Sequence, residues 1–275
     1  TVDENWLIPH FEKMLYDNAQ FVLLISKFLK INRNDYFEKK IIQTIEFINN
    51  SFLNSKNNLL GSAYDADSEG EEGKYYVFNY NELKDIKDIE LYFDVKPDGN
   101  WENKIILKEI KTPPKSVLIK LKDLRKKKKK PFFDNKIQLD LNCLWISALI
   151  SAEKVLPKNG YLQIAETFYS SLEKIFFREK NLYHTNSKTT VFLEDYAYTI
   201  SMLLDLSDQT LKPNYLFKAK ELCQKTIELF YVKEKSIFQK NIIFNNDLFH
   251  KPIDISDNNI PNGNSIMLLN FSRLG

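Results

Sequence analysis

Hydrophobic residues recur with helical spacing along most of the chain. After Pro9, apolar side chains fall three or four positions apart, at Phe11, Met14, Leu15, Ala19, Val22, Ile25 and Leu29. A polar turn, NRND, then leads to a second helical pattern over residues 36–53. Two further pairs of helices are predicted, 139–156 with 160–177 and 192–206 with 215–230, followed by a single helix over 263–274. The pattern predicts an all-α protein built of helical hairpins.

The two helices of each pair differ in character. The first is the more apolar, as expected of an inner helix that packs on several sides, and the second has a charged face, as expected of an outer helix. The unusual polar clusters PHFEKMLYDNA, DLNC, LEDYA and PNGNS all lie at or near the start of a first helix. We therefore expect an incomplete (α/α)6 toroid, a single domain over residues 1–275, with these clusters on one rim and helix N-termini pointing toward a shared cavity.

Two segments interrupt the helical pattern. Residues 64–107 predict a long loop with two short strands, KYYVF and NKIILKEI, which gives a small β excursion near residues 74–110. The second segment, LRKKKKKPFF, carries Arg125 and five lysines before Pro131. No basic face continues elsewhere, so we interpret the run as a solvated helix end near the negative end of the helix dipole.

Composition and charge exclude several classes of protein. The formal net charge of +2 indicates no strongly charged partner, so we expect no nucleic-acid binding. No apolar run approaches the length of a transmembrane helix, so we expect no membrane span. Cys143 and Cys223 lack ligand-like neighbours and are interpreted as reduced core thiols of a cytoplasmic protein. Because metal-ligand spacings and nucleotide-binding glycine patterns are missing from the sequence, no metal and no cofactor are predicted.

The stretch YDADSEGEEGKYYVF, residues 64–78, concentrates carboxylates and glycines. An EF-hand calcium loop fails here, because its twelfth position would be Tyr76, which cannot chelate a cation. Asp65 and Asp67 remain candidates for glycosidic chemistry, which needs one carboxylic acid to protonate the leaving oxygen and a second carboxylate to attack or activate water. The alternative is an acidic turn in which Asp side chains cap backbone N–H groups.

Two further carboxylates, Glu194 and Asp195, lie in the first turn of a predicted helix. A structural role would explain them, because carboxylates there cap N–H groups and interact favourably with the helix dipole. Their place on the shared rim makes one of them a candidate general acid or base.

The PHFEKMLYDNA segment has the densest set of titratable groups in the chain. Spacing of i, i+3 and i+7 would put His10, Lys13 and Asp17 on one helix face, with Tyr16 beside it and Glu12 nearby. Such groups in a core helix are either paired in a buried network or line a cavity, and both alternatives stay open. His184 and His250 receive no role, because neither has ligand spacing.

Several motifs carry a family resemblance. VDENWLIPHFEKMLYDNA, AYDADSEGEEGKYYVF, GNWENKIIL, DNK, LEDYAYTISMLLDL and IPNGNSIMLLNFSRL occur in this order. The sequence resembles the spermatogenesis-associated protein 20 family of thioredoxin-domain-containing proteins. That resemblance implies a thioredoxin-like domain followed by an (α/α)6 domain like that of six-hairpin glycosidases and sugar 2-epimerases. We expect this chain to be part of the (α/α)6 domain, without the covalently linked thioredoxin-like domain and without the last hairpins.

The resemblance also suggests residues that bind substrate. Asn142, Tyr196 and Asn264 fall on the motifs, although Leu141 and Cys143 stand where the family has Trp and Gly, and Asn262 replaces Ser. With Glu12, Lys13, Tyr16 and Asp17 they form the predicted substrate-binding set.

Two classes of function follow from the resemblance. The first is a sugar hydrolase using Asp65, Asp67, Glu194 or Asp195, or a sugar epimerase using His10 as base. The second is a non-catalytic binding or scaffold module that presents the thioredoxin-like domain to a client protein. For the first class we expect the DADSEGEEG loop to bring Asp65 or Asp67 close to the start of the first helix.

Overall fold

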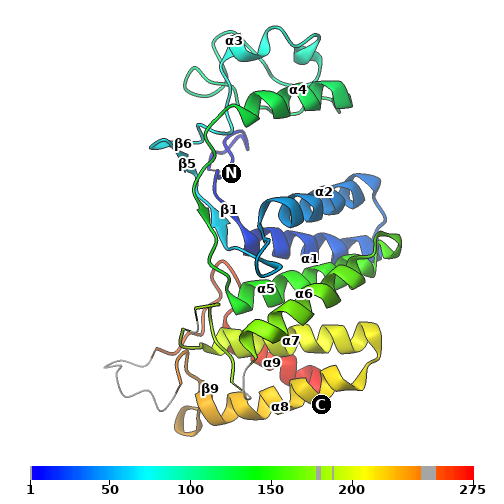
Figure 1. Cartoon of the computed structure of the whole chain (residues 1–275), viewed down its shortest axis with the longest axis vertical. Coiled ribbons are helices and arrows are strands. Elements are labelled where there is room, and N and C mark those ends of the chain that lie inside the picture. The colour runs from blue at the N-terminus through cyan, green and yellow to red at the C-terminus, as the bar shows by residue number, and fades with distance from the viewer. Residues whose placement is uncertain (1, 178–180, 188, 243–251) are drawn as a thin grey trace. The chain divides into compact units, whose positions relative to one another are not determined.

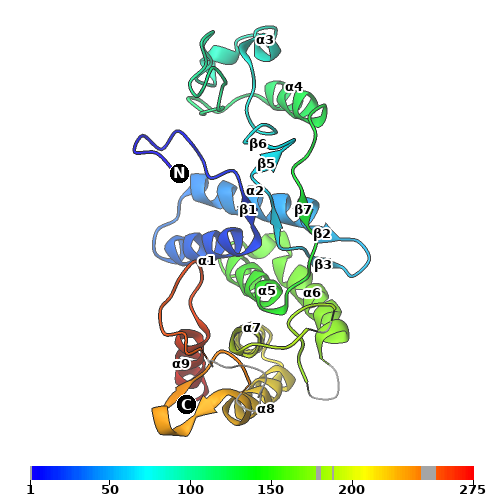
Figure 2. The same ribbon diagram turned by 90° about the vertical axis from the view of Figure 1, so that its left-hand side faces the viewer.

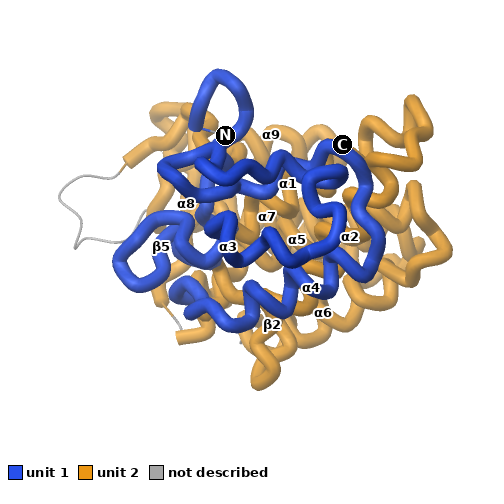
Figure 3. Tube along the Cα trace, turned by 90° about the horizontal axis from the view of Figure 1, so that it is seen from above, with its two compact units in different colours: residues 1–13, 63–134 blue, residues 14–62, 135–275 orange. Residues whose placement is uncertain are grey.

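The computed structural model describes residues 2–177, 181–187, 189–242 and 252–275. The chain divides into two compact units, coloured separately in Figure 3. Unit 1 comprises Thr1–Lys13 and Ala63–Asp134, and unit 2 comprises Met14–Ser62 and Asn135–Gly275. A compact unit need not fold independently, so a single domain over residues 1–275 stays a prediction.

Unit 2 holds the helical hairpins. Its helices are α1 (Leu15–Ile31), α2 (Asp35–Ser51), α5 (Leu139–Glu153), α6 (Tyr161–Phe176), α7 (Leu193–Thr210), α8 (Pro213–Phe230) and α9 (Gly263–Leu274). Helix α5 packs against α1, α6 and α7, while α7 also packs against α8 and α9. Figures 1 and 2 show α1, α5, α7 and α9 as an inner arc, with α2, α6 and α8 on its outer side. The predicted all-α fold of inner and outer helices is confirmed.

Burial explains the difference between inner and outer helices. In α5 every residue except Ser151 is buried, because this helix contacts a neighbour on three sides. In α6 the buried positions follow one face, with Tyr161, Ala165, Phe168 and Leu172 three or four residues apart. The apolar character of each first helix therefore has a direct cause in its packing.

Short hairpins follow two of the outer helices. Strands β2 (Leu53–Asn54) and β3 (Leu59–Leu60) pair antiparallel after α2, and β8 (Tyr231–Val232) and β9 (Ile237–Phe238) pair antiparallel after α8. Short 3-10 helices, η2 (Pro157–Asn159) and η3 (Lys233–Lys235), form tight connections in the same unit. The second strand of each hairpin contacts an inner helix, because the Leu60 N–H donates to Asn142 of α5 and the Phe238 N–H donates to Asn264 of α9.

Unit 1 is smaller and irregular. It contains β4 (Ala63–Tyr64), β5 (Asp67–Ser68), β6 (Glu71–Glu72), α3 (Tyr80–Leu83), η1 (Ile89–Leu91), α4 (Lys115–Lys126) and β7 (Phe133–Asp134). Strands β1 (Lys13–Met14), β4 and β7 form a sheet in that order, and β5 pairs with β6. A small core gathers around Phe78, Ile89, Ile105 and Val117.

Two details of the sequence prediction are wrong. The KYYVF and NKIILKEI segments form no strands, and only an antiparallel bridge joins Phe78 to Ile105. The reason is a turn, because the Gly73 carbonyl accepts hydrogen bonds from the Tyr76 and Val77 N–H groups. Gly73 itself has φ of +72°, a conformation that favours glycine.

The first helix also begins later than predicted. It starts at Leu15, and Lys13–Met14 is extended in β1, which lies beside β4. Residues 10, 13 and 17 therefore share no helix face. None of the described helices combines the length and apolar character that crossing a lipid bilayer requires.

Candidate functional site

The candidate site lies where inner helices α5 and α7 begin, and all its residues belong to unit 2. His184 comes from the loop between α6 and α7. Its backbone N–H donates to Thr189 O at 3.2 Å, and its carbonyl accepts the Leu139 N–H at 2.9 Å. These bonds hold the imidazole beside the first turn of α5.

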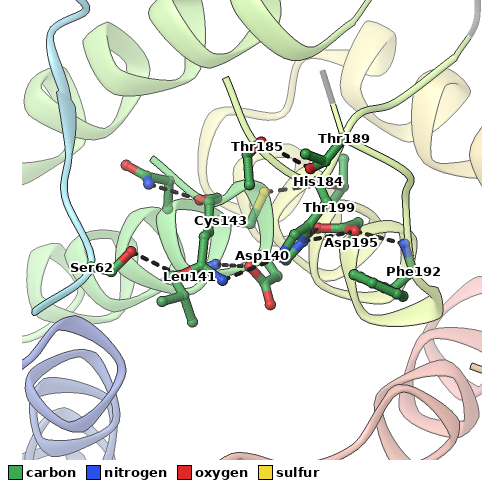
Figure 4. A network of polar contacts seen from close by, with 12 residues as sticks. Ser62, Asp140, Leu141, Cys143, His184, Thr185, Thr189, Phe192, Asp195 and Thr199 are labelled. Atoms are coloured by element: carbon green, nitrogen blue, oxygen red, sulfur yellow. Dashed lines mark hydrogen bonds and ion pairs between the residues drawn. The ribbon is translucent and has the colours of Figure 1, made fainter. Parts of the chain in front are cut away.

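Asp195 orients the imidazole from the first turn of α7. His184 Nδ1 lies 3.0 and 3.1 Å from the two carboxylate oxygens (Figure 4). The same carboxylate accepts the Phe192 N–H at 2.8 Å and so caps the helix. Asp195 is completely buried. A neutral His184 thus donates its Nδ1–H to Asp195, which leaves Nε2 with its lone pair.

Gln138 lies on the other side of the ring, with its Nε2 at 3.2 Å from His184 Nε2. Gln138 Oε1 lies 2.8 Å from Ser62 Oγ, and this hydroxyl also lies 2.7 Å from Lys136 O. If Ser62 donates to Gln138, the Gln138 amide donates to a neutral His184. If Ser62 donates to Lys136 O, the amide can turn over and accept from a protonated His184. This network can therefore satisfy either charge state of the imidazole.

Asp140 adds a second buried carboxyl group to the cluster. It is the second residue of α5 and accepts the Leu141 N–H at 2.8 Å. Ligand atoms of Asp140, His184 and Asp195 all lie within 4.8 Å of one another. Burial, and then the negative charge of Asp195, raises the pKa of Asp140 to about 7, against the opposing effect of His184. A carboxyl group of this kind is partly protonated near neutral pH and can act as a general acid.

Glu194 occupies the corresponding second position of α7. Burial raises the pKa of Glu194, although the Gly263 N–H donates to its carboxylate and lowers the pKa. Its Oε2 is buried without a hydrogen-bond partner among the described residues. Two neighbouring inner helices thus begin with carboxyl groups whose pKa values are raised by burial.

The same three side chains also have the chemistry of a cation site. Asp140, His184 and Asp195 have suitable ligand atoms and spacing for a small metal ion. Both ring nitrogens of His184 nevertheless have polar neighbours, and both Asp195 oxygens accept hydrogen bonds. An ion would have to replace the bond between His184 and Asp195, so the hydrogen-bonded arrangement fits these residues better.

A large cavity of about 920 Å³ lies among α1, α5, α7 and α9. Its lining includes the predicted substrate-binding residue Asp17 and also Tyr198, whose hydroxyl donates to Pro261 O at 2.7 Å. Burial raises the pKa of Tyr198, and Asp140 and Glu194 add to the effect. Tyr198 therefore lines the cavity and also interacts electrostatically with both carboxyl groups. The volume suits a small-molecule ligand.

Three predicted substrate-binding residues instead contact backbone. Asn142 accepts the Leu60 N–H at 2.9 Å and donates to Leu60 O at 3.0 Å and Gln138 O at 2.8 Å. Asn264 makes the same paired contact with Phe238, at 3.0 and 2.9 Å. The Tyr196 hydroxyl hydrogen-bonds the Leu182 backbone. These side chains attach the segments after α2, α8 and α6 to the starts of α5, α9 and α7.

The other predicted residues are more exposed or lie in unit 1. Tyr16 accepts a hydrogen bond from Asn259 at 3.1 Å in unit 2. In unit 1, His10 pairs with Glu12 at 3.2 Å, and both side chains are exposed. Asp65 and Asp67 are exposed too.

The Asp65 carboxylate accepts the Asp67 N–H at 3.2 Å, a local turn contact. Because Asp65 and Asp67 belong to unit 1 and Glu194 to unit 2, a site shared among them stays a prediction.

Asp140, His184 and Gln138 were not predicted as site residues. The sequence does contain a signal for Asp140. It is the second residue of its helix, as Glu194 is of α7, and each of the two follows a leucine. His184 offers no such signal. Its loop contacts bring it to α5 from 44 residues away in the chain, counting from Asp140.

Comparison with known proteins places the chain among its relatives. It matches none of the established protein-family models. It is 23% identical to spermatogenesis-associated protein 20 of Homo sapiens over its whole length. The chain is a homologue of spermatogenesis-associated protein 20. It spans less than half of the length of that relative, 43%, and 43% of the rat protein, to which it is 24% identical.

Solved structures share the fold at low sequence identity. A family 76 glycoside hydrolase from a bovine Bacteroides thetaiotaomicron strain aligns with a TM-score of 0.58 and 9% identity, over 100% of this chain and 45% of that one. A sugar epimerase from a ruminal bacterium aligns with a TM-score of 0.56 and 10% identity, over 85% of this chain and 48% of that one. The fold is therefore that of the (α/α)6 glycosidases and epimerases.

Proposed function

We propose that this chain is a carbohydrate-active (α/α)6 domain that acts on or binds a sugar, in a glycosidase-like or 2-epimerase-like manner. The observation that carries the proposal is the buried Asp140 carboxyl group, with its pKa raised to about 7, beside the pair His184–Asp195. The similar solved structures, a sugar epimerase and a glycoside hydrolase, support the choice of a sugar as substrate.

The two reactions would use the cluster differently. In hydrolysis, Asp140 would protonate the leaving oxygen, and Glu194 would serve as the second carboxylate. In epimerisation, His184, oriented by Asp195, would remove a proton beside a carbonyl group. His10, Asp65 and Asp67 stay proposed contributors from unit 1, and Asp17 and Tyr198 would contact the sugar in the cavity.

A non-catalytic module is the second candidate. It is favoured by Asn142, Tyr196 and Asn264, which use their polar atoms to hold backbone segments. In this alternative the domain presents a thioredoxin-like domain to a client protein. For both candidates we propose that the full-length protein is cytoplasmic and carries the thioredoxin-like domain on the same chain.

The test is a thermal-shift screen of the chain and of the full-length protein against mono- and disaccharides. A sugar that binds the native state raises the melting temperature as its concentration rises. Asp140→Asn should lose any turnover, whereas Glu228→Gln, a change at an exposed carboxylate of the outer helix α8 and away from the cavity lining, should keep it. If no sugar stabilises either protein, the non-catalytic module is favoured.

Turnover of a bound sugar can be followed by proton NMR in D2O. Epimerisation exchanges the proton beside the carbonyl for deuterium, whereas hydrolysis releases a new reducing end without that exchange. Retention of all substrate signals with a bound sugar would indicate a binding domain.

A further inference from the structure

Two half-buried cationic side chains in unit 1 lie against one aromatic ring. Lys13 Nζ lies 4.1 Å from the centroid of the Tyr76 ring. Arg125 Cζ lies 6.0 Å from the same centroid and 5.7 Å from that of Phe78. Tyr76 in turn stacks on Phe11 at 5.9 Å. The ring is therefore a shared surface for an ammonium and a guanidinium group.

Neither cation forms an ion pair with a carboxylate among the described residues. Lys13 Nζ donates to the Phe11 carbonyl at 2.8 Å. Arg125 Nε is buried and has no hydrogen-bond partner in the described part of the chain. Burial lowers the pKa of Lys13 to about 8, and the positive charge of Arg125 adds to this effect. The pKa of Arg125 is also lowered by burial, with Tyr75 and Tyr76 opposing.

Other lysines of the same unit do form ion pairs with carboxylates. Lys74 pairs with Glu69 at 3.2 Å, Lys128 pairs with Glu82 at 3.2 Å, and Lys104 pairs with Glu71. These lysines are half-buried, as Lys13 and Arg125 are, but they have carboxylate partners. Like charges that are partly removed from water and lack a counter-charge raise the free energy of the folded state.

We propose that Lys13 and Arg125 form a binding site for an anionic oxygen group, a carboxylate or phosphate of a small molecule, held beside the Tyr76 ring. A guanidinium group can bind both oxygens of such a group at once, and an ammonium group adds a mobile donor. The Arg125 Nε–H would then gain the partner that the described chain does not give it. The test of this site does not depend on the proposed sugar chemistry, since it follows the ionisation of Lys13 with simple anions.

The experiment measures the ionisation of Lys13 directly. Lysines of the chain are dimethylated with ¹³C-formaldehyde, and the Lys13 signal is assigned by its loss in Lys13→Arg. Inorganic phosphate and acetate are added separately at constant ionic strength. An anion bound at Lys13 should raise the pKa of its ammonium group by about one unit, because an opposite charge favours the ionised form.

Two variants separate a built site from general salt effects. Arg125→Gln should raise the Lys13 pKa without any anion, since a like charge is removed, and should abolish the further rise on adding phosphate. Lys122→Gln changes an exposed lysine of the same helix and should behave as the parent. If Arg125→Gln fails to fold, Arg125→Lys can replace it. This variant keeps the positive charge but lacks the planar guanidinium group that binds two oxygens, so about tenfold more anion should be needed for the same rise in the Lys13 pKa.

The proposal is overturned if neither phosphate nor acetate moves the Lys13 titration in the parent. It is also overturned if Arg125→Gln responds to the anions as the parent does, which would indicate an unspecific ionic effect. A response to phosphate alone would assign a phosphate ligand, and a response to acetate alone a carboxylate ligand. Both of these selective responses support the site, and neither depends on whether a sugar binds unit 2.

Discussion

His184 and Asp195 are joined by a hydrogen bond whose acceptor also caps a helix. Nδ1 of the imidazole lies 3.0 Å from Oδ1 and 3.1 Å from Oδ2, while Oδ2 accepts the Phe192 N–H at 2.8 Å. One completely buried carboxylate therefore fixes the imidazole and the first turn of α7 together. Changes at Asp195 should affect folding as well as any chemistry.

Asp195→Asn is expected to destabilise the chain by about 2 kcal/mol. The two carboxylate oxygens accept from His184 and Phe192, whereas an amide has one oxygen and would place its NH2 group against one of these two donors. Urea unfolding of the parent and the variant measures the difference. Asp208→Asn serves as the control, since its carboxylate is exposed and forms a surface ion pair with Arg273. Equal losses in the two variants would contradict a special role for Asp195.

Asp140 should make stability depend on pH. Its pKa in the folded state is about 7, above the ordinary value of 3.8 for an aspartic acid. The stability it contributes is thus fully present below pH 4 and is lost as the pH rises through 7. Asp140→Asn removes this loss and should be more stable than the parent at pH 8, by about 4 kcal/mol, since the pKa rises by about three units and each unit corresponds to about 1.4 kcal/mol.

Urea unfolding at a series of pH values from 4 to 8 provides the measurement for Asp140. His184, Asp195 and Glu194 are present in both proteins, but Asp140 also acts on the pKa of His184, so the difference between the two curves reports Asp140 together with its charge interactions in the cluster. Parallel stability curves for the parent and Asp140→Asn would show that the carboxyl group is not protonated in the folded state at pH 6.

Gln138 should set the charge of His184. Burial lowers the pKa of His184, but its hydrogen bond and charge interaction with Asp195, aided by Asp140 and Glu194, raise it more, so that the net direction is upward. Gln138→Glu places an acceptor at Nε2 and should raise the His184 pKa further, by about one unit. Gln138→Leu offers no acceptor and should lower it.

The imidazole can be observed by ¹⁵N NMR, with His184→Gln identifying the signal. At high pH the parent should show the Nδ1–H form, since Asp195 accepts that proton. An Nε2–H form, or identical titrations in both Gln138 variants, would exclude the proposed network.

Asn142 tests whether the amides at the helix starts are structural. Asn142→Ala leaves the buried Leu60 N–H and C=O without their partners, so we expect a loss of about 2–4 kcal/mol in the free energy of unfolding. The matched control is Asn214→Ala, because Asn214 is exposed in the first turn of α8. If Asn142→Ala lowers the free energy of unfolding no more than Asn214→Ala does, a structural role is contradicted and Asn142 remains a candidate for binding substrate.

Helical periodicity was sufficient to predict the hairpins. The predicted helix over 263–274 agrees with α9, and the predicted pairs agree with α5–α6 and α7–α8 to within a few residues. Periodicity failed at Phe11 and Met14, which match the helical pattern although Lys13–Met14 is extended in β1. Apolar spacing reports which positions are buried, and β1 shows that burial alone does not specify a helix.

The candidate site was less predictable from the sequence. Glu194 and Asp195 were recognised because they lie together at a helix start. His184 was assigned no role, since it reaches Asp195 only through the loop contacts with Leu139 and Thr189. Burial, which raises the pKa of Asp140, also depends on packing that no local pattern encodes.

Gly263 should be required where α9 meets α7. A Cβ atom at this position would lie 2.6 Å from Leu193 Cγ and 2.7 Å from Cδ2. Leu193 is itself buried, so its side chain cannot easily move away, and overpacking of this kind typically costs 1–3 kcal/mol. Gly263→Ala is therefore expected to lower the free energy of unfolding by about 2 kcal/mol. It should also weaken the hydrogen bond from the Gly263 N–H to Glu194.

The steric cause can be isolated by a double-mutant cycle with Leu193→Ala, measured by urea unfolding. Leu193→Ala alone creates a cavity and should cost about 2–4 kcal/mol. If the clash is the cause, adding Gly263→Ala to this variant should cost little, because the smaller side chain leaves room for the new methyl group. Additive losses in the double variant would show that Gly263 is needed for another reason, such as the approach of its N–H to the Glu194 carboxylate.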